Sequence, residues 1–148
     1  MRKILLILCL LLPALTMAKI EGEYTRQTNN CFISTVAPSG WDCEAPLEEG
    51  VAIERRKQGG YYVFLKTRGA NGHFCECTGL GYMKSDVLVT TSKEHACKVF
   101  VRADGRSASF KSEGAECWTY CGARATLNAD NLKKKHRVPK PRSSHSYG

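Results

Sequence analysis

Three cysteine-bearing stretches indicate how this chain folds: His73-Phe74-Cys75-Glu76-Cys77, His95-Ala96-Cys97 and Cys117-Trp118-Thr119-Tyr120-Cys121-Gly122-Ala123-Arg124-Ala125. They hold five of the eight cysteines within 53 residues, between short runs rich in β-branched and aromatic side chains. Such a density of cysteines in a short chain is typical of small exported domains whose cores are supported by disulfides. We therefore expect a small β domain held together by disulfides.

The first 18 residues have the pattern of a secretory signal peptide. Met1-Arg2-Lys3 is positively charged, residues 4–12 are apolar, and Thr16-Met17-Ala18 offers small residues at the −3 and −1 positions of a cleavage site. The apolar run is too short to span a bilayer, which takes about 20 residues. The mature protein is thus expected in the periplasm or secreted, with no transmembrane segment. Cys9 leaves with the signal, so seven cysteines remain.

The positive charge of the chain is concentrated at its ends. Eight of the 22 Lys and Arg residues are Arg2, Lys3 and the six cations within residues 133–142, which leaves 14 basic residues against 14 acidic ones. A neutral body gives no reason to expect a nucleic-acid-binding surface on the domain. We place the folded domain at residues 19–131 and a disordered basic tail at residues 132–148, where no apolar period remains.

Short strand-like runs recur along the domain with turn signals between them. They cover residues 22–26, 31–36, 51–56, 61–68, 74–83, 87–91, 97–102 and 107–111, and residues 41–50 are interpreted as an acidic loop. About eight short strands and no convincing helix predict an all-β fold, a single antiparallel barrel or sandwich. Cys31 and Cys43 bracket the turn at residues 37–40, and a bridge between them would close a short loop.

The C-terminal half of the domain carries a more specific pattern. It consists of Gly69-Ala70-Asn71-Gly72-His73-Phe74-Cys75, then Cys97 at the start of a strand, then Cys117-x-x-Tyr120-Cys121-Gly122-Ala123-Arg124-Ala125. This pattern resembles that of small exported proteobacterial β-barrel proteins, some of them likened to periplasmic lysozyme inhibitors. The resemblance implies a compact barrel and the bridges Cys97–Cys117 and Cys75–Cys121. With Cys31 and Cys43 also paired, the odd cysteine is Cys77, our candidate for a free thiol.

The His-x-Cys repeats suggest a metal site as an alternative. His73, Cys75 and Cys77, and likewise His95 and Cys97, place nitrogen and sulfur donors at strand spacing, and Zn or Cu(I) favours such ligands. Because exported cysteines oxidise, and a disulfide removes the thiolates a metal needs, we expect no metal or cofactor. The alternative is an envelope metal-binding or redox-linked protein that uses His73, Cys77 and His95.

The sequence contains no motif that indicates an enzymatic function. The chain has no Cys-x-x-Cys, no Gly-x-Ser-x-Gly and no metalloprotease signature, so we do not expect an enzyme. The preferred function is binding, as a periplasmic inhibitor or immunity protein against a lysozyme-like cell-wall hydrolase. A second alternative is a cell-surface protein that acts through its basic tail.

Five residues are candidates for contact with a protein partner: Arg124, Asn71, His73, Glu48 and Glu49. Arg124 follows a cysteine and could present a fixed cation to a carboxylate, although an internal structural role is as reasonable. Asn71-Gly72 supplies the positive φ angles that a tight turn needs. The acidic residues could complement a basic enzyme or simply be solvated.

Overall fold

The computed structural model describes residues 19–29, 31–43, 46–69, 73–92, 96–122 and 125–136. Eight strands close into a barrel, and two more form a separate hairpin. The all-β barrel predicted from the sequence is thereby confirmed. The barrel strands are β1 (Gly22–Thr28), β4 (Leu47–Arg55), β5 (Tyr61–Arg68), β6 (Phe74–Lys84), β7 (Val87–Thr91), β8 (Lys98–Ala103), β9 (Ser107–Glu113) and β10 (Ala129–Lys134); the hairpin is β2 (Cys31–Ile33) with β3 (Trp41–Cys43), and η2 (Ala115–Tyr120) is a short 3-10 helix.

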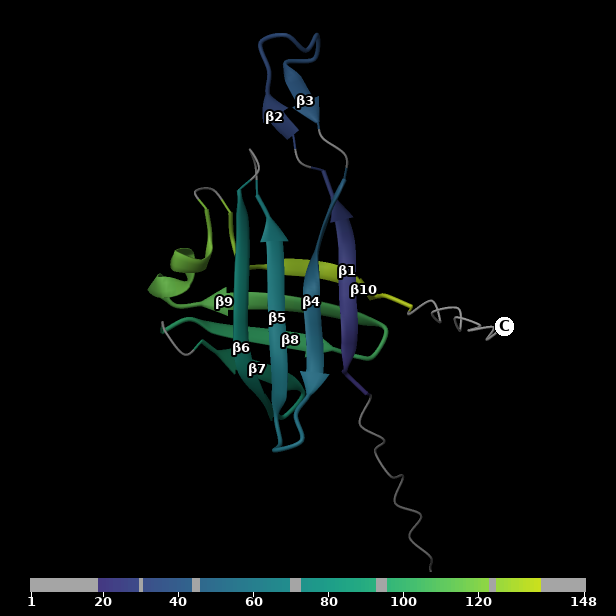
Figure 1. The fold of residues 1–148 in the computed structure, drawn as a ribbon, viewed down its shortest axis with the longest axis vertical. Helices are drawn as coiled ribbons and strands as arrows, with labels where there is room; N and C mark the ends of the chain where they lie inside the picture. The colour runs from purple at the N-terminus through teal and green to yellow at the C-terminus, as the bar shows by residue number, and fades with distance from the viewer. Residues whose placement is uncertain are drawn as a thin grey trace, which may run out of the picture.

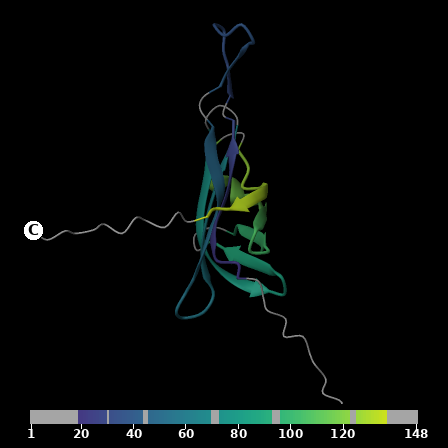
Figure 2. The ribbon, with the colours of Figure 1, turned by 90° about the vertical axis from the view of Figure 1, so that its right-hand side faces the viewer.

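The barrel is an antiparallel meander closed by its first strand. β4 to β10 are neighbours in chain order, and β1 pairs with both β10 and β4. Figure 1 shows β1, β4, β5 and β6 side by side, with β8, β9 and β10 crossing behind them. Because closure pairs each strand on both sides, the sheet has no free edge. The β2–β3 hairpin projects beyond one end of the barrel, as the side view in Figure 2 also shows.

Strict alternation along the strands builds the core. In β5, Val63, Leu65 and Thr67 are buried, whereas Tyr62 and Phe64 face solvent, as a period of two requires. Burying one face of every strand in a shared interior supplies most of the driving force for folding. Further members of the core are Tyr24, Val51, Ile53, Cys77, Leu88, Val99, Val101, Phe110, Leu127 and Leu132.

Two glycines let β6 and β7 approach closely inside the barrel. A Cβ atom on Gly79 would lie 2.5 Å from Cγ2 of Thr90, and one on Gly81 would lie 2.8 Å from Cδ1 of Leu88. No side chain fits at either position without displacing a neighbour. β6 runs unbroken through both glycines, since the space they leave is filled from β7.

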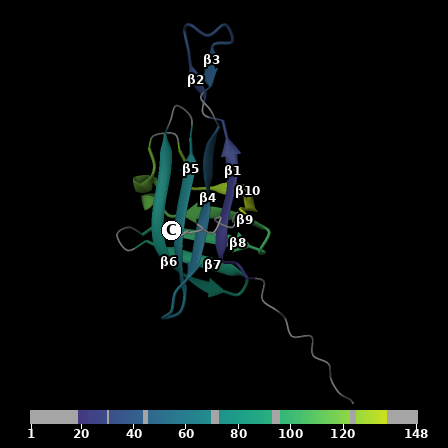
Figure 3. The same cartoon turned by 45° about the vertical axis from the view of Figure 1, so that its right-hand side comes forward.

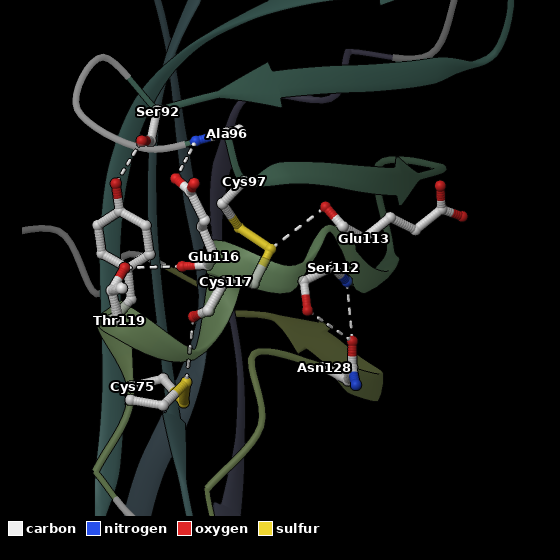
Figure 4. Close-up of a disulfide and its surroundings, with 12 residues drawn as sticks. Cys75, Ser92, Ala96, Cys97, Ser112, Glu113, Glu116, Cys117, Thr119 and Asn128 are labelled. Atoms are coloured by element: carbon white, nitrogen blue, oxygen red, sulfur yellow. Dashed lines mark hydrogen bonds between the residues drawn. A yellow bond between two sulfur atoms is a disulfide. The ribbon is translucent and has the colours of Figure 1, made fainter.

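Two disulfides fasten η2 to the barrel wall. Cys97 is bonded to Cys117, and Cys75 to Cys121, with Cα atoms 4.7 and 4.0 Å apart. These are the two bridges that the family resemblance implied. Figure 4 shows the Cys97–Cys117 bridge, beside which the Glu116 carboxylate accepts a hydrogen bond from the backbone N–H of Ala96 at 3.0 Å. Cys117 within η2 is therefore tied to the residue that precedes β8, and Cys121 just after η2 is tied to β6.

Two predicted boundaries are wrong. The domain does not end at residue 131, because Leu132, Lys133 and Lys134 belong to β10 and Leu132 is fully buried. The predicted acidic loop at residues 41–50 instead contains β3 and the start of β4.

The predicted signal peptide (residues 1–18) and the tail beyond residue 136 lie outside the described residues. None of the helices in the described ranges is long and apolar enough to cross a membrane.

Candidate functional site

The barrel end that carries the β2–β3 hairpin is the candidate functional site. β1 ends there, β4 begins, β5 ends and β6 begins, so several connections converge on it (Figure 3). We call this region the hairpin end and define it by residues 28–29, 31–43, 47–49, 68–69, 73–74 and 122. Most of it comes from loops and strand ends, where binding residues of rigid scaffolds usually lie.

The hairpin is closed at its base by a covalent bond. Cys31 and Cys43 face each other in the β2–β3 register and are joined by a disulfide, with Cα atoms 4.0 Å apart. At the other end the N–H of Ser34 donates to the carbonyl of Gly40 at 3.0 Å, and the N–H of Gly40 donates to the carbonyl of Ala37 at 2.9 Å. Gly40 has a φ of +72°, a conformation that glycine adopts without strain. The turn is thus fixed at both ends.

The hairpin presents apolar side chains to solvent. Ile33 exposes 72% of its surface, Val36 87% and Trp41 53%, and Ile33 lies directly opposite Trp41 in the register. Asp42, the neighbour of Trp41, is also exposed. Large apolar side chains that cluster on a protruding element mark interaction surfaces more often than ordinary surface.

A further exposed aromatic ring lies at the start of β6. Phe74 exposes 48% of its surface, and the guanidinium of Arg68 lies 5.4 Å from the centre of its ring. A cation over an aromatic face restrains both side chains. Phe74 is therefore held in place on the same barrel end as the hairpin.

Glu49 does not have the role predicted for it, and Glu48 is held in ion pairs. Glu49 is only 2% exposed; its carboxylate accepts hydrogen bonds from Nε of Arg26 at 2.5 Å and from the backbone N–H of Arg68 at 3.1 Å. A carboxylate enclosed in this way cannot meet a partner, so the predicted contact through Glu49 is wrong. Glu48 is engaged by Lys135 at 3.2 Å and lies 3.9 Å from Lys66, which offsets the charge on which the prediction rested.

Two loops with predicted contact residues are brought together at the hairpin end. The half-buried His73 lies against the loop after η2, because a Cβ on Gly122 would be 2.8 Å from its Nδ1 atom. The N–H of Gly122 donates to the carbonyl of Phe74 at 2.8 Å, next to the Cys75–Cys121 bridge. Asn71 and Arg124, the other predicted contacts of these loops, lie outside the described residues.

Cys77 is a buried free thiol on the inner wall of β6. It is 3% exposed, and burial raises the pKa of its thiol above the usual value. A thiol in this state is a poor nucleophile and a poor metal ligand. No group of three or more His, Cys, Asp or Glu residues that could hold a metal occurs in the part of the chain that the structure describes, which does not include His95.

Of the predicted contact residues, His73 and Glu48 lie at this end of the barrel, and Glu49 is buried there. The bracketing cysteines and the turn residues signalled a closed loop, whereas Ile33, Val36 and Trp41 were not singled out. The sequence signal for these three residues was the placement of large apolar side chains inside a loop too short to bury them.

In comparisons with known proteins, no family model, no curated protein and no solved structure matches the chain.

Proposed function

We propose that this protein is an exported, non-enzymatic binding protein, a periplasmic inhibitor or immunity protein that acts against a lysozyme-like cell-wall hydrolase. The observation that carries the proposal is the disulfide-closed hairpin, which extends from the barrel with Ile33, Val36 and Trp41 exposed. A narrow, stiff projection with an apolar tip suits insertion into a concave surface. The cleft in which a hydrolase holds a polysaccharide chain is such a surface.

The energetics of the hairpin favour binding. The half-exposed Trp41 would bury roughly 100 Å² in a complex, worth about 2–3 kcal/mol, and Trp is frequent among residues that dominate interfaces. A loop already fixed by a bridge and a hydrogen-bonded turn loses little conformational entropy when a partner orders it. Asp42, exposed beside Trp41, would speed encounter with a basic enzyme more than it would strengthen the complex.

The remaining features are compatible with this role. Three disulfides are expected in an oxidising compartment, and the sequence begins with a signal-peptide pattern. The choice of a lysozyme-like target follows from the resemblance of residues 69–125 to small exported barrels. At the hairpin end, His73 and Phe74 lie where a partner seated on the hairpin would also meet the barrel.

The test is inhibition of muramidases by the mature protein at micromolar concentrations. We expect binding and inhibition by the unaltered protein, and a loss of about tenfold to a hundredfold in Trp41→Ala, the factor that about 1.4–2.8 kcal/mol represents. Val36→Asp should weaken binding as well, because it places a charge at the centre of the contact. Trp118→Ala is the matched control, since Trp118 is 72% exposed on η2.

Two results would count against the proposal. If lysozyme and related muramidases are neither bound nor inhibited at micromolar concentrations, the inhibitor function is wrong. If they are inhibited equally by the unaltered protein and by Trp41→Ala and Val36→Asp, the hairpin is not the contact surface.

A further inference from the structure

A groove of about 950 Å³ lies on the outer face of β1, β4 and β5, away from the hairpin end. Tyr62 and Phe64 project into it from β5, and Ala52 of β4 is the register neighbour of Phe64. Its volume falls in the range of small-molecule and cofactor sites. The proposed contact with a hydrolase makes no use of this groove, so its chemistry can be considered independently.

The groove offers one aromatic face held in a fixed orientation. Tyr62 exposes 48% of its surface, and Arg56 covers one side of its ring, with the guanidinium 5.1 Å from the ring centre. Tyr62 lines the groove, whereas Arg56 does not. Phe64, 39% exposed, follows about 7 Å further along the strand. The electron-rich faces of such rings attract polarised C–H groups.

Four of the charged side chains around the groove form two ion pairs with one another. Nε of Arg55 lies 3.2 Å from the Glu21 carboxylate, and Nζ of Lys135 lies 3.6 Å from that of Glu23. Lys135 also contacts Glu48, as described above. The groove's other charged side chains are Lys19, Glu54 and Lys134, so the lining totals four cations and three carboxylates, a formal charge of +1 with His136 neutral. It therefore has little net charge with which to attract a strongly charged ligand.

Oxygen atoms flank the two rings. Glu54 of β4 lies opposite Tyr62 in the sheet register, and Thr78 of β6 lies opposite Phe64; both line the groove. A carboxylate accepts hydrogen bonds, and a hydroxyl both donates and accepts them. The groove therefore combines apolar ring faces with acceptors and donors at their edges.

We propose that this groove binds a neutral carbohydrate chain, with one sugar ring stacked on Tyr62 and the next unit over Phe64. A pyranose ring carries C–H groups on its faces and hydroxyl groups around its rim, which matches aromatic faces flanked by Glu54 and Thr78. The compensated charges of the lining favour an uncharged glycan over an acidic or basic peptide. This activity goes beyond the proposed inhibition and uses a different surface.

The test uses tetra-N-acetylchitotetraose and cellotetraose, two uncharged β-linked tetrasaccharides, with the mature protein. We expect calorimetric binding at millimolar concentrations or below, with amide chemical-shift changes confined to β1, β4, β5 and the adjoining part of β6. Tyr62→Ala should weaken binding roughly tenfold, which corresponds to about 1.4 kcal/mol. Ala52→Glu, which keeps both rings but fills and charges the floor, should weaken it as well. Trp118→Ala should bind as the unaltered protein does, and thermal unfolding checks that each variant is folded.

Several outcomes would overturn this proposal. The first is that neither tetrasaccharide binds, and the second is that the folded variants Tyr62→Ala and Ala52→Glu bind as tightly as the unaltered protein. The third is that the amide chemical-shift changes map to other strands, and the fourth is that a hexalysine or hexaglutamate peptide binds and the tetrasaccharides do not. The result is separable from the hydrolase test, because Trp41→Ala should leave glycan binding intact and Tyr62→Ala should leave hydrolase inhibition intact.

Discussion

The disulfide between Cys31 and Cys43 should hold the hairpin in shape while contributing little to the barrel. β2 and β3 have three residues each, and isolated two-stranded hairpins are at best marginally stable in water. The bridge closes a loop with a sequence separation of 12, for which the chain-entropy model gives about 3 kcal/mol. The same model gives about 4 kcal/mol for the Cys75–Cys121 bridge, whose separation of 46 spans barrel strands.

We therefore predict a local effect when Cys31 and Cys43 are both replaced by Ser. The amide hydrogens of Ser34 and Gly40, which are bonded within the turn, should exchange with solvent up to roughly a hundredfold faster, the factor that about 3 kcal/mol represents. The melting temperature of the barrel should change by no more than a few degrees. Hydrogen–deuterium exchange followed by NMR and a thermal scan measure the two quantities on one sample.

A variant with Cys75 and Cys121 replaced by Ser is the control, and its barrel should melt at a clearly lower temperature. Unchanged protection at Ser34 in the hairpin variant would refute the reasoning, because the turn would then suffice without the bridge. A loss of barrel stability as large as that of the control would refute it as well.

Three further predictions concern the barrel. Glu49→Ala should lower the free energy of unfolding by about 2–4 kcal/mol, because it leaves the backbone N–H of Arg68 and the Nε–H of Arg26 without their acceptor. Glu48→Ala should cost under about 1 kcal/mol. Denaturant titrations compare the two variants, and equal losses would contradict the assignment. Hydrogen bonds from the backbone N–H groups of Ser107 and Arg106 hold the pKa of Asp104 below its ordinary 3.8, so the stability they add is present above that pH and is lost as the pH falls through the lowered pKa. Asp104→Ala should therefore lower the free energy of unfolding at pH 7 and lower it less in acid. A loss of stability that does not depend on pH would contradict this. A thiol-reactive dye should label Cys77 alone, slowly in the folded protein and fully after unfolding, and labelling of several cysteines would show that the bridges are absent.

Strands rich in aromatic and β-branched residues could be predicted from the sequence. The run from Tyr61 to Arg68 has this composition, and β5 has these bounds. β10 was missed for a physical reason. Ala129 and Leu132 both face the core although they lie three residues apart, because the register with β9 shifts between them and Asn131 has a φ of +58°. This irregularity breaks the period of two on which strand recognition depends.

The burial of Glu49 could not be predicted because its partners are distant in sequence. Arg26 lies 23 residues before it, and the backbone N–H of Arg68 lies 19 residues after it. Only closure of the barrel brings these groups together. Trp41 was placed in an acidic loop by the sequence, whereas it lies on β3, and its exposure follows from the projection of the hairpin away from the barrel.

Hydrogen exchange of the mature protein, alone and in complex with a muramidase, tests the central claim most directly. The claim is that the hairpin end binds the partner. It predicts slowed exchange in residues 31–43 and near Phe74, with exchange in β8 and β9 unchanged. A protected surface on β8 and β9, or exchange in residues 31–43 that the enzyme does not alter, would contradict the claim.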